Sequence, residues 1–262
     1  MQGFDFYNHH GYLLVSDLYS NEEKAALLKE VTALTDWPET PGKWMRYYEP
    51  HRITQEKILC RIENFIPYSE IMRKALTQGR IIECLNTIHR EPVVLYKDKI
   101  NFKLPGANGF VAHQDAPAFS AQGQKSHITV LIALDDMTVE NGCLEVATNT
   151  REIWEQKRVL LHSVKGEILP EFQTEFTWKP IAMHSGDVLF FGSYLPHRSG
   201  PNLTERARRA LYVTYNALSD GDKHDQYYID KRKAFPPECE RVPGVDYSEG
   251  AKIYNVANPI YV

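Results

Sequence analysis

The chain has 262 residues, of which 43% are hydrophobic and 24% are charged, as is ordinary for a globular protein. Thirty lysines and arginines face 34 acidic residues, for a net charge of −4, so the chain lacks the basic excess of a nucleic-acid-binding protein. Its apolar runs, such as Ile128–Leu134, are too short for a membrane-spanning helix, and the charged N-terminal segment differs from a signal peptide. We therefore expect a cytoplasmic protein with no nucleic-acid or membrane partner.

The four cysteines are widely spaced along the chain. Cys60, Cys84, Cys143 and Cys239 are at least 24 residues apart, which excludes the short CxxC spacing of structural zinc sites and redox pairs. Because the sequence has no secretion signal, we expect these cysteines to be reduced and buried as small hydrophobic residues.

The N-terminal part, up to about residue 90, is predicted to be mainly helical. Ser20, followed three residues later by Glu23, is typical of a capped helix start, and apolar residues then recur at helical spacing. Residues 38–66 show no clear period. The predicted elements are a strand at 11–15, a helix from Ser20 to Trp37, which Pro38 ends, and a helix over Pro67–Arg90, which Gly79 interrupts.

Past Glu91 the pattern changes to short β-rich runs separated by Gly, Pro, Asn and Asp. The predicted strands are Val93–Lys103, Ile128–Leu134, Gly142–Val146, Asp187–Phe191 and Ala210–Tyr215, with a short helix at 151–157. Such spacing favours a sandwich or barrel over βαβ units. We therefore predict one α+β domain over residues 1–262: a jelly roll, or double-stranded β-helix, at about 91–216, buttressed by the helices of 1–90 and followed by a tail at 217–262.

His113 and Asp115 are the first candidates for chemistry. If residues 111–115 are extended, both side chains point to one face, with their Cα atoms about 6.5–7 Å apart. An imidazole and a carboxylate placed in this way can hold two adjacent positions of an octahedral metal, and a third protein ligand would complete the facial triad of non-haem iron oxygenases. A His-x-Asp pair also occurs by chance, as a hydrogen-bonded surface histidine near a turn, so the surrounding sequence must decide.

The segment 186–216 supplies that context. A buried-strand run ends shortly before His197, which is the candidate third ligand. In the strand that follows, alternation puts Arg208 on one face and Arg209 on the other. An inward arginine near a metal is costly unless it pairs with an anion, and the carboxylate of a co-substrate would accept a bidentate pair of hydrogen bonds from Arg208. A solvated face is the alternative for Arg206 and Arg209.

The sequence around these residues resembles the phytanoyl-CoA dioxygenase family of iron(II)/2-oxoglutarate-dependent oxygenases. The matching stretches, in the order of the family, are 99–106, 113–119, 128–146, 185–191 and 197–216. The resemblance implies a jelly-roll dioxygenase in which His113, Asp115 and His197 bind Fe(II). In this family the arginine eleven residues after the distal histidine binds the carboxylate of 2-oxoglutarate, and that residue is Arg208 here.

The resemblance also implies further contacts to the co-substrate. The family uses a polar residue on the strand before His-x-Asp, a role that fits Asn101, and Lys99 and Lys103 share its face. Ser199 and Thr129 are further candidates. The implied reaction uses O₂, decarboxylates 2-oxoglutarate to succinate and hydroxylates a substrate carbon. Because the aspartate is present where halogenating relatives have a small residue, halogenation is not expected.

The sequence constrains the substrate less than the reaction. Several basic residues in predicted loops permit an anionic substrate: Lys43, Arg46, Arg52, Lys103 and Lys125. The compact chain favours a small polar or zwitterionic molecule, such as an aminophosphonate, an amino-acid-like or a betaine-like compound. An acyl-CoA or a secondary metabolite is the alternative for the same chemistry.

Two other interpretations remain open at this point. One is a non-catalytic jelly-roll binding module, and the other is a zinc hydrolase that uses the same three ligands. A further open choice concerns four aromatic residues that either cover the substrate or pack into the core: Trp37, Trp44, Tyr47 and Tyr48.

Overall fold

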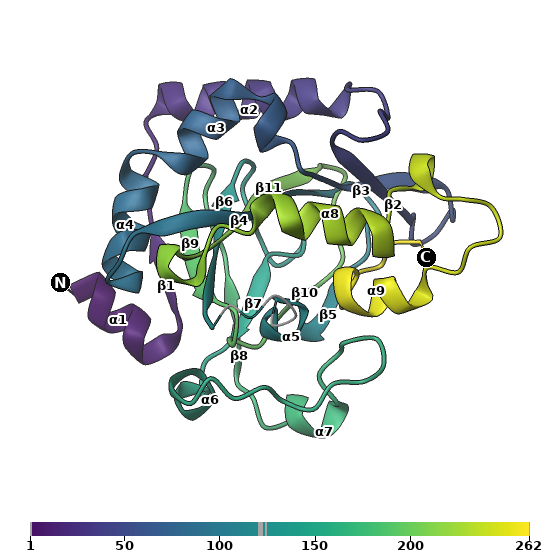
Figure 1. Ribbon diagram of the computed structural model, residues 1–262. Helices are drawn as coiled ribbons and strands as arrows, with labels where there is room; N and C mark the ends of the chain where they lie inside the picture. The colour runs from purple at the N-terminus through teal and green to yellow at the C-terminus, as the bar shows by residue number, and fades with distance from the viewer. Residues whose placement is uncertain (1, 120–122, 124, 262) are drawn as a thin grey trace.

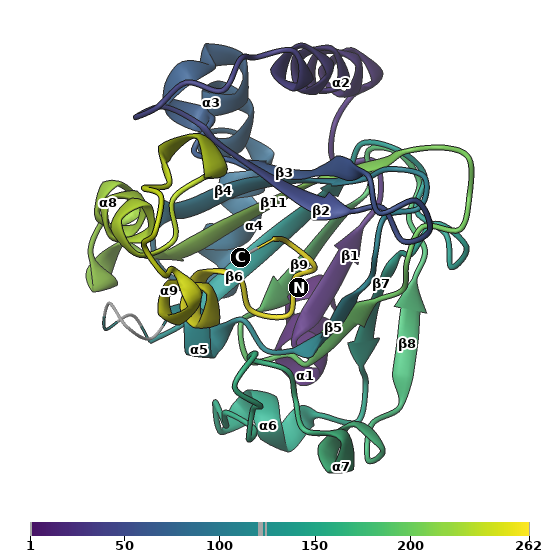
Figure 2. The same ribbon diagram turned by 90° about the vertical axis from the view of Figure 1, so that its right-hand side faces the viewer.

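Two antiparallel β-sheets stacked face to face form the centre of the structure, a computed structural model that describes residues 2–119, 123 and 125–261 (Figure 1, Figure 2). In order across the larger sheet, the strands are β1 (Tyr12–Val15), β9 (Val188–Gly192), β6 (His127–Ala133), β11 (Arg208–Ala217), β4 (Val93–Lys103), β3 (Lys57–Glu63) and β2 (Met45–Pro50). The smaller sheet has the order β5 (Phe110–His113), β10 (His197–Ser199), β7 (Leu144–Ala147) and β8 (Trp178–Ile181). This arrangement confirms the predicted α+β jelly roll.

The inner faces of the two sheets share one buried apolar cluster. Leu131, Leu189 and Ala210 of the larger sheet belong to it together with Leu144 and Val146 of the smaller sheet. Burial of these side chains supplies the main stabilisation of the sandwich, because removing apolar surface from water is worth roughly 25 cal/mol per Å².

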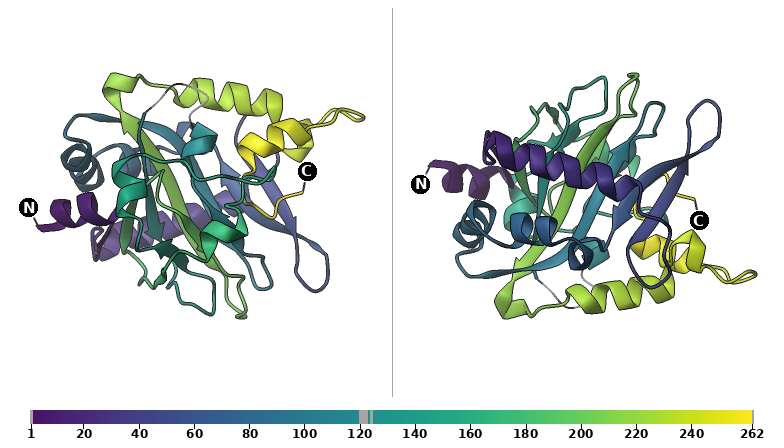
Figure 3. Two further views of the ribbon diagram at one scale, coloured as in Figure 1. Left: turned by 90° about the horizontal axis from the view of Figure 1, so that it is seen from below. Right: turned by 90° about the horizontal axis from the view of Figure 1, so that it is seen from above.

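Helices cover the outer face of the larger sheet (Figure 3). Ile100, Val130 and Leu211 point outward from the sheet and are fully buried beneath them. The covering elements are α1 (Gln2–His10), α2 (Asn21–Thr35), the 3₁₀ turn η1 (Ile66–Tyr68), α3 (Glu70–Thr77) and α4 (Arg80–His89). As predicted, the Ser20–Glu23 capping box starts α2, and Gly79, at φ +68°, separates α3 from α4.

Strand β11 separates these two environments. Leu211 and Val213 lie in the cluster beneath the helices, whereas Ala210 and Tyr212 lie in the cluster between the sheets. Arg208 therefore belongs to the inner face by the same alternation, as its sequence position predicts. Strand β4 pairs with β11 so that Lys103 is opposite Arg208.

The hairpin β2–β3 and helix α1 were not expected from the sequence. The pairing of β2 with β3 shifts register between Tyr47 and Tyr48, and this irregularity breaks the alternation on which strand prediction depends. The last four residues of β3 are all buried, so polar and apolar positions do not alternate there either. Helix α1 is short and lies in a segment whose composition is mixed.

The C-terminal segment, predicted only as a tail, packs over the inner face of β2 and β3 (Figure 2). Tyr47 stacks on Phe235 with ring planes 2° apart. Beside this stack, Glu63 forms buried ion pairs with Arg61 and Lys231, which tie β3 to the C-terminal helix α8. The elements of this segment are η3 (Leu218–Asp220), α8 (His224–Ala234), η4 (Glu238–Glu240) and α9 (Ser248–Tyr254).

The remaining elements are three short helices at the edge of the smaller sheet and next to β5. They are α5 (Ala116–Phe119), α6 (Arg151–Glu155), which was predicted, and α7 (Pro170–Gln173). All four cysteines are free, as expected, but Cys239 is exposed and Cys84 is half-buried, so the prediction of burial is wrong for these two. Within the described ranges, no helix has the length and apolar character needed to cross a membrane.

Candidate active site

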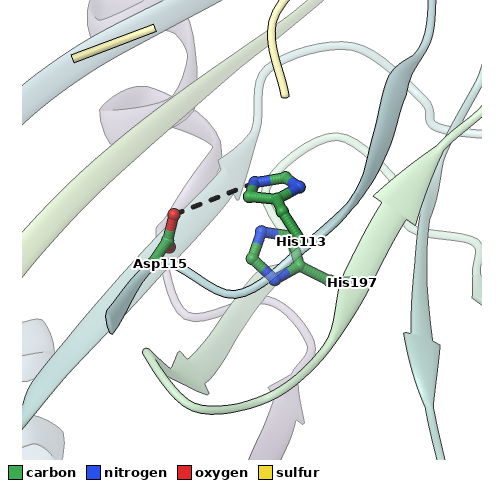
Figure 4. A group of neighbouring side chains, drawn as sticks. All are labelled: His113, Asp115 and His197. Atoms are coloured by element: carbon green, nitrogen blue, oxygen red, sulfur yellow. Dashed lines mark ion pairs between the residues drawn. The ribbon is translucent and has the colours of Figure 1, made fainter. Parts of the chain in front are cut away.

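Three predicted ligands converge at the open end of the smaller sheet (Figure 4). His113 ends β5 and His197 begins β10, and the two residues are directly opposite each other in the antiparallel pair. Asp115 lies just past the end of β5, not within an extended strand as expected, yet its carboxylate faces His113 with Oδ1 3.9 Å from Nε2. Ligand atoms of all three residues lie within 4.8 Å of one another, a spacing that suits one shared ion.

Backbone carbonyls fix the tautomer of both histidines. The Nδ1 of His113 lies 2.7 Å from the carbonyl oxygen of Val111, and the Nδ1 of His197 lies 3.0 Å from that of Leu195. Since a carbonyl oxygen only accepts, each Nδ1 carries the proton and donates it, which leaves the Nε2 lone pair free for a metal.

The electrostatics of the triad favour a neutral imidazole beside a charged carboxylate. Burial, together with the facing His197, lowers the pKa of His113 to about 3. Burial alone would raise the pKa of Asp115, but the neighbouring histidines and Lys99 lower it overall. Two neutral imidazoles and one carboxylate are the donor set of non-haem iron(II) sites, so the residues present fit Fe(II).

Thr129 lies next to Asp115. Its hydroxyl is 3.5 Å from Asp115 Oδ2 and 3.0 Å from the hydroxyl of Thr214. This position, which the sequence did not indicate, makes Thr129 a neighbour of the carboxylate ligand as well as part of the pocket wall.

Arg208 lies at the other end of the inner face, fully buried and only partly satisfied. Its Nη2 donates to the carbonyl oxygen of Gly142 at 3.0 Å, while Nε and Nη1 have no hydrogen-bond partner among the described residues. A buried guanidinium with unpaired donors is costly, and a carboxylate would satisfy both. Arg208 therefore fits the distal carboxylate of 2-oxoglutarate.

Lys103 accompanies Arg208 but is already satisfied. Its Nζ donates to Ser199 Oγ at 2.7 Å, to the carbonyl oxygen of Gly142 at 3.2 Å, and to that of Gly200. Burial, and then the charge of Arg208, lower the pKa of this lysine well below its usual value. Gly142 thus accepts hydrogen bonds from both cations.

Gly142 also has a backbone that suits only glycine. Its φ is +76°, and a Cβ at this position would lie 2.2 Å from the carbonyl oxygen of Gly200 and 2.8 Å from Lys103 Nζ. The turn that carries this carbonyl therefore requires a residue without a side chain.

Asn101 lies on β4 between Lys99 and Lys103 and lines the pocket around the triad. Its Oδ1 is buried and has no hydrogen-bond donor in the described part of the chain. Ser199 lines the same pocket. Each candidate co-substrate residue named from the sequence therefore lies on the inner face, but Ser199 is already bonded to Lys103.

Lys97 was missed by the sequence reasoning, although Lys99 was considered. Both line the pocket with Asp115, since β4 alternates and Asn101, Lys99 and Lys97 point to the same side. Burial, and then the charge of Lys97, lower the pKa of Lys99 to about 7. Lys97 could have been predicted from the sequence, because alternation along β4 puts the residue two positions before Lys99 on the same face.

The four aromatic residues of the 36–50 segment pack and do not line this pocket. Trp37 contacts Trp44, with ring centroids 4.3 Å apart, and the hydroxyl of Tyr47 donates to the carbonyl oxygen of Phe235. Tyr47 is therefore a core residue, Trp37 and Trp44 are partly buried against a second cluster, and Tyr48 is half-buried beside Arg46. Lys103 lies on the inner face of β4, but none of the basic residues proposed to attract an anion is among the described residues that line the pocket: Lys43, Arg46, Arg52, Lys103 and Lys125.

A wide groove leads toward the site. It has a volume of about 870 Å³ and runs between the C-terminal segment, from Ser248 to Ile260, and strands β5 and β10. Phe110, Arg198 and Ser199 line both the groove and the pocket around the triad. The groove thus gives a small molecule a route from solvent to the inner face.

A jelly roll with two histidines and one aspartate at its open end defines the class of iron(II)- and 2-oxoglutarate-dependent oxygenases. Among solved structures, the chain is similar to EctD from S. alaskensis, crystallised with 2-oxoglutarate and 5-hydroxyectoine, with a TM-score of 0.69, 19% identity, and coverage of 84% of this chain and 76% of that one. The chain matches the model of the phytanoyl-CoA dioxygenase family over residues 7–210 and belongs to that family.

Two curated relatives are much more similar in sequence. The 2-aminoethylphosphonate dioxygenase of the uncultured bacterium HF130_AEPn_1 is 43% identical over 243 residues, which cover 92% of this chain and 91% of the relative. The methylphosphonate hydroxylase of Gimesia maris is 41% identical over 234 residues, covering 88% and 86%. The protein is therefore a dioxygenase that uses Fe(II), 2-oxoglutarate and O₂, and the binding-module and zinc-hydrolase alternatives are excluded.

Proposed function

We propose that this protein hydroxylates a small organophosphonate at the carbon bonded to phosphorus. The two curated relatives are named for 2-aminoethylphosphonate and for methylphosphonate. These compounds share only the phosphonate group and the carbon that carries it. Methylphosphonate has a single carbon, so it can be hydroxylated only at the carbon bonded to phosphorus. Hydroxylation at that carbon is the one reaction that is possible for both compounds.

The observation that carries this proposal is the charge of the pocket. Lys97 and Lys99 line it, while Asp115 is the one carboxylate among its described lining residues. Asp115 would offset one charge of bound Fe(II), and the two carboxylates of 2-oxoglutarate would offset the other charge of the metal and the charge of Arg208. The two lysines then leave a positive surplus that suits a phosphonate dianion better than a zwitterion with one negative charge.

In this proposal the residues of the chain bind and orient the reactants. His113, Asp115 and His197 would hold Fe(II), Arg208 would pair with the distal carboxylate of 2-oxoglutarate, and Asn101 would contact the same co-substrate. Bound iron and 2-oxoglutarate supply the oxidising chemistry. The reaction consumes substrate, O₂ and 2-oxoglutarate and gives the alcohol, succinate and CO₂. One oxygen atom enters the C–H bond and the other enters succinate.

Electrons also balance in this scheme. Decarboxylation of 2-oxoglutarate supplies two electrons, and conversion of C–H to C–OH supplies two more, which together reduce O₂.

The apolar walls of the pocket, including Phe110 and Phe191, exclude water from the reacting carbon.

A substrate panel tests the proposal. Succinate formation and product mass would be measured with methylphosphonate, ethylphosphonate and 2-aminoethylphosphonate, against their carboxylate counterparts acetate, propionate and β-alanine, with ectoine, a betaine and an acyl-CoA as further arms. We expect substrate-dependent succinate and a mass gain of one oxygen with the phosphonates alone. Coupled turnover of a carboxylate, betaine or acyl-CoA without turnover of any phosphonate would overturn it.

A further inference from the structure

Two lysines that line the pocket around the triad have no acceptor for their ammonium groups among the residues described. Lys97 and Lys99 are half-buried on the inner face of β4. Neither has an ion pair or a hydrogen bond from its side chain to any part of the chain that the structure describes. Two adjacent ammonium groups without acceptors repel each other, so this arrangement needs a further anion.

Apart from Arg208, whose Nε and Nη1 are also unpaired, the neighbouring cations have partners. Arg198 pairs with Glu145 at 2.8 Å, and Arg61 and Lys231 share Glu63. Lys103 has three oxygen acceptors. The two carboxylates whose charges act on both Lys97 and Lys99 are Glu63 and Asp115, and neither forms an ion pair with these lysines. Glu63 is shared by Arg61 and Lys231, and Asp115 faces the histidines.

Aromatic rings hold the two ammonium groups in the pocket. Lys99 Nζ lies 5.1 Å from the ring centroid of Tyr212. Lys97 Nζ lies between two rings, 5.6 Å from that of Phe119 and 5.5 Å from that of Tyr227. Cation–π contacts at these distances position a charge without neutralising it, which leaves all the N–H donors free for a ligand.

The length of strand between them separates the pair from Arg208. Along β4, Lys99 is four residues and Lys97 six residues from Lys103, which is paired with Arg208. At about 3.3 Å per residue, these separations are roughly 13 and 20 Å of strand. One carboxylate at Arg208 therefore does not satisfy both lysines.

We propose that Lys97 and Lys99 form the phosphonate-binding subsite of this enzyme. The inference rests on the proposed function and assigns its anion-recognising residues. A substrate oxidised at the carbon bonded to phosphorus must hold its anion one bond away from the reacting carbon, so its anchor must share the pocket of the metal ligands. Lys97 and Lys99 are in that pocket with His113, Asp115 and His197, and two ammonium groups can donate to separate phosphonate oxygens.

The proposed subsite also predicts the substrate specificity of the enzyme. Among the described residues that line the pocket, no carboxylate besides the metal ligand Asp115 is present to receive an ammonium group. We therefore expect the enzyme to recognise the phosphonate group of its substrate and not an amine. Ethylphosphonate and 2-aminoethylphosphonate should have KM values within about threefold of each other, because no charged partner distinguishes them.

The experiment uses the full-length enzyme with Fe(II) and distinguishes phosphonate binding from 2-oxoglutarate binding. Lys97→Gln and Lys99→Gln remove one charge each, and Lys97→Arg and Lys99→Arg keep it. Lys57→Gln is the matched control, because Lys57 also lies over a tyrosine ring, at 4.3 Å from Tyr48, but is exposed and paired with Glu238. The measurements are the KM for methylphosphonate, the KM for 2-oxoglutarate, and calorimetric binding of methylphosphonate without O₂.

Losing one charge-assisted contact should raise the phosphonate KM and the calorimetric Kd by about 10- to 150-fold. The KM for 2-oxoglutarate should change by less than about twofold, the arginine variants should recover most of the affinity, and the control should match the wild type. A rise in the 2-oxoglutarate KM with unchanged phosphonate binding would assign the lysines to the co-substrate and overturn the inference. If the wild type turns over no phosphonate at all, the proposed function fails first, so the two failures are distinguishable.

Discussion

The two faces of β11 use neighbouring arginines in opposite ways. On the outer face, Arg209 donates to both carboxylate oxygens of Asp135, at 2.8 and 2.9 Å, and to the hydroxyl of Thr32 on α2 at 3.2 Å. On the inner face, Arg208 is fully buried, yet two of its nitrogen atoms have no partner in the described structure. One residue along the strand thus separates a satisfied arginine from an unsatisfied one.

This difference teaches how to tell a structural charge from a ligand-binding one. A buried polar group without a partner destabilises the fold, so a cluster of such groups that faces a pocket indicates a ligand that completes them. The inner face carries two such groups, Arg208 and Asn101, together with the half-buried, unpaired Lys97 and Lys99. Beneath the C-terminal segment, by contrast, Glu63 forms ion pairs with Arg61 and Lys231. Changes on the inner face should therefore affect catalysis, and changes on the outer face should affect stability.

The largest expected effect comes from the metal ligands. His113→Ala should lower turnover by about a thousandfold or more, because the variant loses one of three ligands to the ion that supplies the chemistry. Iron content after dialysis and succinate formation would measure this loss. The melting temperature without metal should change by less than about 4 °C; a collapse of the fold would instead make His113 a structural residue.

Arg208 should give the next largest effect. Arg208→Ala should raise the KM for 2-oxoglutarate by about 10- to 150-fold, as expected for the loss of a charge-assisted pair. Arg208→Lys keeps the charge but loses the two parallel donors, so its KM should lie between those of the wild type and the alanine variant. Steady-state kinetics at saturating phosphonate would measure both, and an unchanged KM in both variants would contradict the assignment.

Arg209→Ala tests the outer face of the same strand, where we expect a loss of stability and no change in co-substrate kinetics. Its ion pair with Asp135 is partly exposed, with about a quarter of each side chain accessible, 23% for both, so we expect a loss of about 1 kcal/mol in the free energy of unfolding. The KM for 2-oxoglutarate should stay at the wild-type value. Denaturant unfolding and the same kinetic assay would check these two results. Co-substrate kinetics sensitive to Arg209 but not to Arg208 would show that the faces are reversed.

A smaller, pH-dependent effect is expected at another outer-face charge. Asp98 of β4 accepts from the backbone N–H groups of Phe65 and Ile66 and pairs with His224 at 2.8 Å. Burial alone would lower the pKa of His224, but the hydrogen bond and charge of Asp98 raise it above 6.5.

Since the folded-state pKa of His224 is the higher one, its contribution to stability is complete below pH 6.5 and is lost as pH rises through the folded pKa. The unfolding free energy of the wild type should therefore fall over this window. His224→Gln should flatten that part of the profile while leaving 2-oxoglutarate kinetics unchanged. Parallel profiles for the two proteins would contradict this linkage.

Much of the fold and the identity of the site were accessible from the sequence because they depend on local patterns. The alternation of β11 places Arg208 and Arg209 on opposite faces, and the Ser20 cap and Gly79 break define the helices. The spacing of His113 and Asp115 together with His197 names three side chains that the fold brings together.

What the sequence did not reveal depends on contacts between distant segments. The hairpin β2–β3 is irregular at Tyr47 and Tyr48, and its inner face is buried only because a segment nearly 200 residues later covers it. The unpaired state of Lys97 and Lys99 likewise could not be predicted, since it depends on which carboxylates the fold brings near them. Whether a charge has a partner is a property of the three-dimensional structure alone.

Gly142 gives the site one further property, which concerns its tolerance to mutation. Its carbonyl oxygen holds Lys103 and Arg208 together, and its left-handed backbone leaves no room for a Cβ. A single methyl group there would push the turn away from both cations and disturb co-substrate binding without altering any charged or ligating side chain. The proposed co-substrate site at Arg208 therefore depends partly on a position that has no side chain, which a list of ligating residues alone would omit.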